Sequence, residues 1–355
     1  MKKVLRLLLM LLLFLAAVFL FSFLVDPANV FYARYDQTVA EILASGHSAE
    51  GVENMDDRRF LTLYANLRTQ PIDTLVLGSS RAMQITPAVT GDPNTFVAGV
   101  TGSDLRDCIS AYELFAQKGF APKTVVLSLD FWYLSAGNLD SRAMTDGYEQ
   151  FCRDNGLAPL ESGSAKLSRI KNFFSFSYFQ SSVEYLARGK HKTLPTPTDA
   201  AFSVKALRRP DGSYGYEQAL RDRTQAEIDQ SASDKQIADN IAAGFTGIDQ
   251  GLCDQLETFV RTLTAQGIHV KLLLSPVHPI YYAYMQAHPD TYSVVFDTER
   301  FCRALAARTG AAVCGSYDPS ALGVTGSDFY DEVHPRTEAL QKYYDLALTQ
   351  EATNG

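Results

Sequence analysis

The chain has few cysteines, no excess of basic residues and no low-complexity composition. Its five cysteines include no C-x-x-C pair, so the sequence does not indicate a zinc site. Lysine and arginine total 32 against 40 acidic residues, a formal charge of −8, which argues against sequence-independent binding to nucleic acid. Hydrophobic residues fill 46% of the 355 positions, which excludes a mainly disordered chain and supplies the core of one large domain or two small ones.

The odd number of cysteines leaves at least one thiol unpaired. Cys302 and Cys314 are near enough in the sequence for a local disulfide, and unpaired buried thiols are the alternative that we favour. The full set is Cys108, Cys152, Cys253, Cys302 and Cys314. We expect neither a metal nor another cofactor.

A long hydrophobic run lies near the N-terminus. Residues 7–25 carry no charge and reach roughly 28 Å as a helix, about the thickness of the bilayer hydrocarbon. A cleaved secretory signal is the alternative, but its apolar core usually runs only about 7–15 residues, and no convincing small-x-small cleavage site follows here. We therefore expect residues 1–25 to remain attached as a transmembrane signal anchor. No second stretch is long enough to span a bilayer.

Basic residues precede the apolar run, at Lys2, Lys3 and Arg6. By the positive-inside rule they keep the N-terminus in the cytoplasm and place everything after Asp26 outside the membrane. The sequence thus predicts a single-pass protein of the cell membrane with an acidic, extracytoplasmic body.

Five short apolar runs follow, and helical patterns separate several of them. Because the runs are apolar nearly throughout, they indicate strands that are covered on both faces, as in a parallel sheet. The alternation of strands and helices predicts an α/β fold, a doubly wound parallel sheet between two helical layers. The expected strands are 73–78, 95–100, 123–130, 269–275 and, more weakly, 311–316, and the expected helices are 104–117, 249–266, 296–308 and 336–348.

Two segments depart from this alternation. Residues 26–70 indicate a polar stalk with short helices at 37–44 and 58–67. Residues 137–244 indicate an inserted cap on the strand ends, with a polar helix at 225–240, which leaves 71–136 and 245–350 for the α/β domain. An aromatic cluster in the cap either lines an acyl or glycan groove, rests on the bilayer or, as we favour, packs the cap onto the sheet. Its members are Phe173, Phe174, Phe176, Tyr178 and Phe179.

A serine turn follows the first strand, in Leu-Gly-Ser-Ser-Arg over residues 77–81. A serine on a tight turn at the carboxyl end of a strand lies at the rim of the sheet, where the N–H groups of a following helix also point. By itself this turn is more often structural than catalytic. Near the last helix, Asp331 and His334 are three residues apart, so one turn can direct both side chains to a common point. There, His334 can take the proton of Ser80 while Asp331 orients the imidazole ring.

Taken together and in this order, these motifs resemble the SGNH (GDSL-like) hydrolase superfamily. The resemblance implies a five-stranded three-layer sandwich of the SGNH/flavodoxin-like type and ester chemistry, with Ser80 as nucleophile, His334 as base and Asp331 as its orienting acid. It also implies an oxyanion hole from the backbone N–H groups of Ser80 and Gly102. The third family block usually supplies an asparagine, and Asp130 stands at that place. The insertion lies outside the resemblance.

Two departures from the family pattern involve Ser79 and Asp130. Ser79 replaces the usual aspartate before the nucleophile, a change associated with membrane-anchored branches. An ionised Asp130 cannot donate to an oxyanion and would repel its charge. This leaves three arrangements for Asp130. It faces the site in its ionised form and weakens catalysis, or it is kept protonated and donates to the oxyanion. In the third arrangement it is turned away and held by backbone N–H groups or by an arginine. We favour the last arrangement.

Two further residues are candidates for binding substrate. Arg81, beside the nucleophile, either binds an anionic substrate group or forms a salt bridge with an acid, and we favour the salt bridge. His278 follows the fourth strand in a loop bounded by prolines, where it either contacts substrate or packs.

The anchor, the motifs and the altered third block are similar to bacterial cell-envelope proteins of the D-alanine-transfer (DltD-type) and alginate O-acetylation kinds. The resemblance implies an extracytoplasmic esterase or O-acyltransferase that acts on an acylated surface polysaccharide or a teichoic-acid-like polymer. The alternative is a non-catalytic or weakly catalytic protein that binds the polymer and docks onto a multi-spanning acyltransferase. No nucleic-acid partner is expected.

Overall fold

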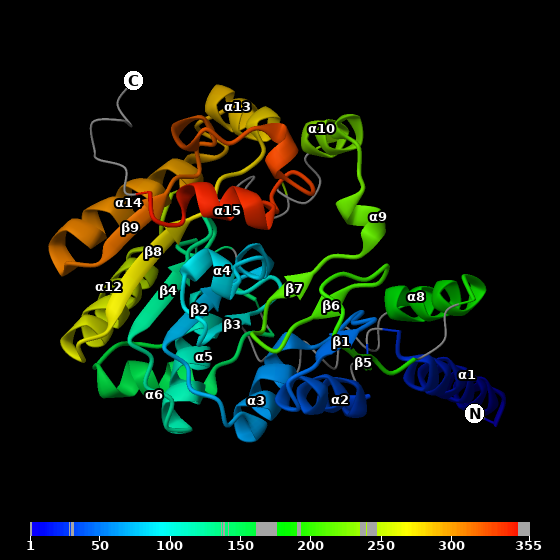
Figure 1. Ribbon diagram of the computed structural model, residues 1–355. Coiled ribbons are helices and arrows are strands. Elements are labelled where there is room, and N and C mark those ends of the chain that lie inside the picture. The colour runs from blue at the N-terminus through cyan, green and yellow to red at the C-terminus, as the bar shows by residue number, and fades with distance from the viewer. Residues whose placement is uncertain are drawn as a thin grey trace.

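The computed structural model describes residues 2–27, 29, 32–135, 137, 139–140, 142–160, 176–189, 193–234, 239 and 247–346. A five-stranded parallel sheet lies at its centre (Figure 1), in the order β3-β2-β4-β8-β9. All five predicted strands are present, including the weak fifth. Their bounds are Thr74–Gly78 (β2), Thr95–Gly99 (β3), Thr124–Ser128 (β4), His269–Leu274 (β8) and Ala312–Gly315 (β9).

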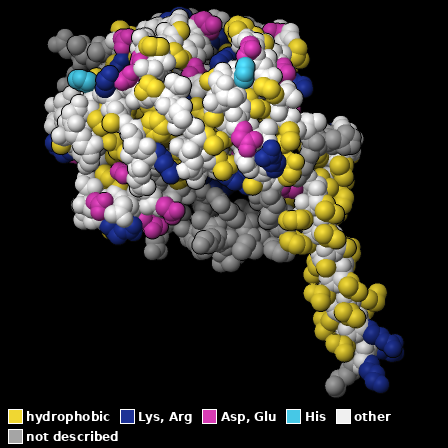
Figure 2. Space-filling view, turned by 60° about the horizontal axis from the view of Figure 1, so that its bottom comes forward, with side chains coloured by type: hydrophobic (Ala, Val, Ile, Leu, Met, Phe, Trp, Pro, Cys, Tyr) yellow, Lys and Arg dark blue, Asp and Glu magenta, His cyan; other side chains and the backbone are white. Residues whose placement is uncertain are grey.

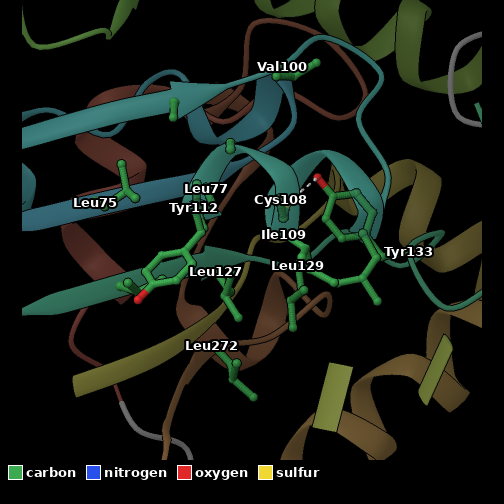
Figure 3. Close-up of a cluster of buried hydrophobic side chains, with 14 of the residues drawn as sticks. Leu75, Leu77, Val100, Cys108, Ile109, Tyr112, Leu127, Leu129, Tyr133 and Leu272 are labelled. Atoms are coloured by element: carbon green, nitrogen blue, oxygen red, sulfur yellow. Dashed lines mark hydrogen bonds between the residues drawn. The ribbon is translucent and has the colours of Figure 1, made fainter. Parts of the chain in front are cut away.

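Helices cover both faces of this sheet, which makes the fold α/β and doubly wound. Successive strand residues point to opposite faces, so Leu75 and Leu77 enter one core while Val76 enters the other. Figure 3 shows the first core, where strand leucines meet Cys108, Ile109 and other side chains of α5. The helices of this layer are α5 (Leu105–Gln117), α12 (Gln250–Ala265) and α14 (Ser293–Thr309), and α4 (Pro87–Thr90) and α15 (Thr337–Tyr343) lie on the other face.

The strand order creates a reversal beside β2. The chain runs from β2 to the edge strand β3 and then crosses back to β4 on the other side of β2. At such a reversal the loops after the two central strands diverge, and ligands of open α/β sheets bind in the crevice at that carboxyl edge. Ser80 follows β2 and Asp130 follows β4, so both lie at this edge.

Residues 26–70 belong to the folded body rather than to the expected stalk. The two predicted helices are present as α2 (Ala33–Ala44) and α3 (Asp57–Leu67). Val39 of α2 and Phe60 and Leu61 of α3 are fully buried in the same core as the sheet. The helices are amphipathic, and the apolar stripes have a core to enter because the sheet lies beside them.

A second, antiparallel sheet of order β5-β1-β6-β7 joins these residues to the insertion. The described part of 137–244 does not form one separate cap but divides among several places. It contributes α6 (Asp146–Asp154) to the main core and supplies three of the four strands. Its helix α10 (Gln225–Asp234), the predicted polar helix, reaches the loop before α15, where Ser231 donates to Glu332 at 2.6 Å. The strands are Ser48–Glu50 (β1), Thr196–Thr198 (β5), Leu207–Arg208 (β6) and Tyr214–Gly215 (β7).

Helix α1 (Lys2–Val25) is long and apolar enough to cross a membrane, and it is the one such helix in the described residues. It projects from the body as an apolar rod with basic side chains at its far end (Figure 2). Helix α8 (Phe176–Ala187) packs beside its base: the rings of Phe21 and Phe179 are 5.5 Å apart, and Tyr178 donates to Asp26 at 2.6 Å. Tyr178 and Phe179 thus contact the base of α1, an arrangement that the sequence did not predict. Phe173, Phe174 and the side chain of Phe176 lie outside the described part of the structure.

The five cysteines are buried and unpaired, so the disulfide between Cys302 and Cys314 does not form. Burial raises the pKa of the Cys302 thiol, and the same effect raises that of Cys314. A thiol with a raised pKa carries little thiolate at neutral pH and is unreactive.

Candidate active site

The turn after β2 places Ser80 at the edge of the sheet. Ser79 accepts a hydrogen bond from the Arg81 backbone N–H at 3.1 Å, and this starts the short 3-10 helix η1 (Ser80–Ala82). Gly78 is required because a Cβ there would lie 2.9 Å from the carbonyl oxygen of Ser128. The Gly-Ser-Ser sequence therefore lets the chain turn sharply against β4 and present the Ser80 hydroxyl.

The structure brings the three predicted catalytic side chains together. Ser80 Oγ lies 2.9 Å from His334 Nε2, and His334 Nδ1 lies 2.8 Å from Asp331 Oδ2 and 3.0 Å from Oδ1. Asp331 Oδ1 also accepts the backbone N–H groups of Val333 and His334, at 2.9 and 2.8 Å. This local turn explains why the acid and the base are three residues apart.

The electrostatics of the pair suit proton transfer. Burial by itself raises the pKa of Asp331, but His334 and the two backbone N–H groups lower it to about 2, so the carboxylate is ionised. Burial lowers the pKa of His334, but the charge of Asp331 and its hydrogen bond outweigh this effect and raise it above the usual value. Asp331 therefore stabilises the imidazolium that forms when His334 accepts a proton.

Of the two interpretations of Arg81, a salt bridge or a contact with an anionic substrate group, the structure shows the salt bridge. Its side chain is 1% exposed, and Nη1 lies 2.7 Å from Asp130 Oδ1. Its Nε donates to the carbonyl of Val333 at 2.9 Å, and Nη2 donates to the carbonyls of Ser275 and Pro276. Arg81 thus joins the nucleophile turn to the loop that holds His334.

Asp130 is held by an arginine, as the favoured arrangement requires; that its carboxylate is turned away from the oxyanion stays a prediction. It is fully buried, at 0% exposed, and forms a salt bridge with Arg81. Burial raises the pKa of Asp130, while Arg81 and the Ser79 hydroxyl act in the opposite direction. The guanidinium charge also offsets the carboxylate charge near the reacting oxygen.

The backbone N–H groups of Ser80 and Gly102 are the candidate oxyanion donors. Among the described residues, neither the Ser80 nor the Gly102 N–H donates to a protein acceptor. Gly102 is exposed, with φ of +62°, a left-handed conformation that glycine adopts without strain. The loop that contains it is fixed on both sides, because the Thr101 N–H donates to Asp57 at 2.9 Å and the Trp132 ring N–H donates to the Ser103 carbonyl at 3.0 Å.

His278 is buried beside the loop that holds His334, and its backbone N–H donates to the Glu332 carbonyl at 2.9 Å. It is 1% exposed, and its Nδ1 accepts the Ile280 backbone N–H at 3.3 Å, which caps α13 (Pro279–Ala287). Its ring packs on Phe329 at 5.5 Å, and burial lowers its pKa. The second interpretation of this residue, packing in a proline-bounded loop, therefore describes it.

The sequence analysis missed Tyr216, which stands beside the base. Its ring is 5.9 Å from the His334 ring and 4.9 Å from that of Tyr330. The preceding hairpin is fixed to the end of η1, since the Tyr214 N–H donates to the Met83 carbonyl at 2.8 Å. The local sequence offered one signal for Tyr216, a pair of tyrosines in a polar insertion. This signal did not indicate that the ring of Tyr216 would contact His334.

The chain matches no family model, and no curated protein matches it. Its function is therefore inferred from the geometry of the site.

Proposed function

We propose that this protein is an extracytoplasmic serine esterase or O-acyltransferase of the SGNH type that acts on acyl esters of a cell-envelope glycopolymer. The observation that carries the proposal is the hydrogen-bonded chain from Ser80 through His334 to Asp331 at the carboxyl edge of a parallel sheet. Helix α1 and the basic residues before its apolar run support an anchored body outside the membrane.

In the acylation step, Ser80 Oγ attacks the acyl carbonyl while His334 Nε2 takes the hydroxyl proton. The carbonyl π electrons move to the oxygen, and the backbone N–H groups of Ser80 and Gly102 stabilise the negative charge. When the ester C–O bond breaks, the imidazolium returns its proton to the leaving sugar oxygen. The acyl group is then an ester of Ser80.

In the second step, water or another sugar hydroxyl gives its proton to His334 and attacks the acyl-Ser80 ester. Collapse of the second tetrahedral intermediate releases Ser80, which recovers its proton from the imidazolium. Water gives hydrolysis and a sugar hydroxyl gives acyl transfer, and the same residues perform both. Asp130 takes no part, so the site works with two oxyanion donors instead of three; a lost donor typically costs about 10²–10³ in rate.

Labelling with a fluorophosphonate tests this proposal, because the probe reacts only with an activated serine. Full-length protein in a neutral detergent should be labelled, whereas Ser80→Ala should not be labelled and His334→Ala should react far more slowly. Ser79→Ala is the matched control, since it removes the neighbouring hydroxyl and leaves the nucleophile. If the folded wild-type chain is not labelled, the non-catalytic polymer-binding partner becomes the better account.

A further inference from the structure

Four arginines gather on one side of the triad, around Tyr330. The guanidinium carbon of Arg336 lies 4.5 Å from the centre of the Tyr330 ring, and its Nη1 and Nη2 donate to the Arg221 carbonyl at 3.2 and 3.3 Å. Arg223 Nη1 donates to the Tyr330 carbonyl at 3.4 Å. Arg209 packs against Gly215, and its charge acts on Tyr330 together with those of Arg221 and Arg336.

Within the described residues, these four arginines lack the carboxylate partner that most other arginines have. Most of the described arginines lie within 4.0 Å of a carboxylate oxygen, as Arg81 does with Asp130, but in the described residues none of these four does. Instead they donate to backbone carbonyls, and the buried Nε of Arg221 has no hydrogen-bond partner. This concentration of positive charge occurs in a protein whose formal charge is −8.

Acidic groups nearby act on individual arginines at longer range. Asp211 faces Arg209, Glu227 faces Arg223, and Glu338 acts on Tyr330 from α15. All four arginines are partly buried, and the Nε of Arg221 is fully buried. Gathering partly desolvated like charges is unfavourable unless an anion joins them, and arginine binds carboxylates and phosphates well through its planar set of donors.

The cluster is connected to the triad by two edge-to-face ring contacts. Tyr330 packs on Tyr216 at 4.9 Å, and Tyr216 packs on His334 at 5.9 Å. A chain whose ester lies at Ser80 would therefore meet the arginines with a neighbouring unit. Tyr330 is also the residue just before Asp331, so the position of the cluster is fixed relative to the triad.

We propose that Arg209, Arg221, Arg223 and Arg336 form a subsite for the anionic groups, carboxylate or phosphate, of a polyanionic glycopolymer. The choice of polymer as acyl donor or acceptor rests on the proposed function, whereas binding of the anion does not. The arginines thus bind a negatively charged polymer in preference to a neutral one. They hold one unit of the polymer while Ser80 reacts with an ester on a nearby unit.

Binding is measured with a fluorescent oligogalacturonate on full-length Ser80→Ala protein in a neutral detergent. We expect Arg209→Gln and Arg223→Gln each to weaken binding about tenfold, the size of one charge-assisted hydrogen bond. Arg223→Lys should retain part of the affinity because it keeps the charge. Added NaCl should weaken binding by screening the charges. Arg153→Gln on α6 is the matched control for loss of one positive charge, and thermal unfolding of each variant verifies the fold.

Competition identifies the anion. Methyl-esterified oligogalacturonate, which has the same backbone without its charge, should compete poorly. Stronger competition by sodium polyphosphate than by oligogalacturonate assigns the subsite to phosphate, and the reverse assigns it to carboxylate. With active enzyme, acetate release from acetylated polygalacturonate should fall more in Arg223→Gln than release from its methyl-esterified form.

Three results would overturn the subsite: equal competition by the charged and methyl-esterified chains, undiminished binding in the folded Arg209→Gln/Arg223→Gln double variant, or no binding at low salt. Each is separate from a failure of the proposed function, which is read from labelling of Ser80 by the fluorophosphonate. A chain that binds the polyanion but is not labelled keeps the subsite and loses the enzyme.

Discussion

Replacing Asp130 by asparagine separates stability from catalysis at the buried ion pair. Asp130 and Arg81 are 0% and 1% exposed, and their charged groups are 2.7 Å apart. Removing one charge of a buried pair usually costs about 3–5 kcal/mol, because the other charge stays buried without compensation. Asparagine keeps the shape and one acceptor oxygen for Arg81, so we expect a loss near the lower end, about 3 kcal/mol.

This loss should lower the unfolding midpoint by roughly 4 °C, because a chain of this length has an unfolding entropy of about 0.7 kcal/mol/K. The single tryptophan of the chain, Trp132, is two residues from Asp130, so intrinsic fluorescence of the full-length protein in detergent reports unfolding close to the pair. The double variant Arg81→Met/Asp130→Asn removes both charges and should be more stable than Arg81→Met, which leaves the carboxylate alone. An unchanged midpoint in Asp130→Asn would refute the energetic role of the pair.

Turnover should respond differently. Asp130 is bonded to Arg81, and no hydrogen bond joins its side chain to Ser80, His334 or Asp331 among the described residues; its charge acts on His334 only through space. Turnover per folded molecule should therefore change far less than the factor of about 10²–10³ that an oxyanion donor contributes. Hydrolysis of p-nitrophenyl acetate, divided by the fraction of molecules that a fluorophosphonate titrates, gives this value. A large rise in Ser80-dependent turnover would show that the carboxylate faces the oxyanion, and would refute the arrangement described here.

Three further predictions concern the base, the N-terminal segment and the body. Ester hydrolysis should fall as pH falls through the raised pKa of His334, since only neutral imidazole accepts a proton. In pH–rate profiles, Asp331→Asn should move this acidic limb to lower pH and slow turnover by about 10⁴. Mass spectrometry of membrane-extracted protein should find peptides from residues 1–25, and a mature start near residue 26 would show cleavage instead. In thermal unfolding, Phe60→Ala should lower the free energy of unfolding by about 3–5 kcal/mol, and Asn66→Ala at an exposed position should leave it nearly unchanged. Equally small effects of both variants would show that residues 26–70 form a stalk outside the folded body.

A single sequence was enough to predict the main sheet and the residues that meet at its carboxyl edge. Strands such as β2, covered on both faces, read as continuous apolar runs, because each residue enters one of two cores. The spacing of Asp331 and His334 also carried its own geometry, because a three-residue separation is satisfied by one local turn. Both signals are local, so a single sequence displays them.

The surroundings of the triad depend on contacts between segments that are far apart in the sequence. Strands β6 and β7 have two residues each, too short for an alternating pattern, and β6 pairs with β1 from far earlier in the chain. The ion pair of Arg81 with Asp130 forms because the loops after β2 and β4 meet at the carboxyl edge of the sheet, and sequence spacing does not encode the distance between these loops. The four arginines come from the insertion and from the start of α15, so their charges meet only when the insertion folds against the catalytic loop.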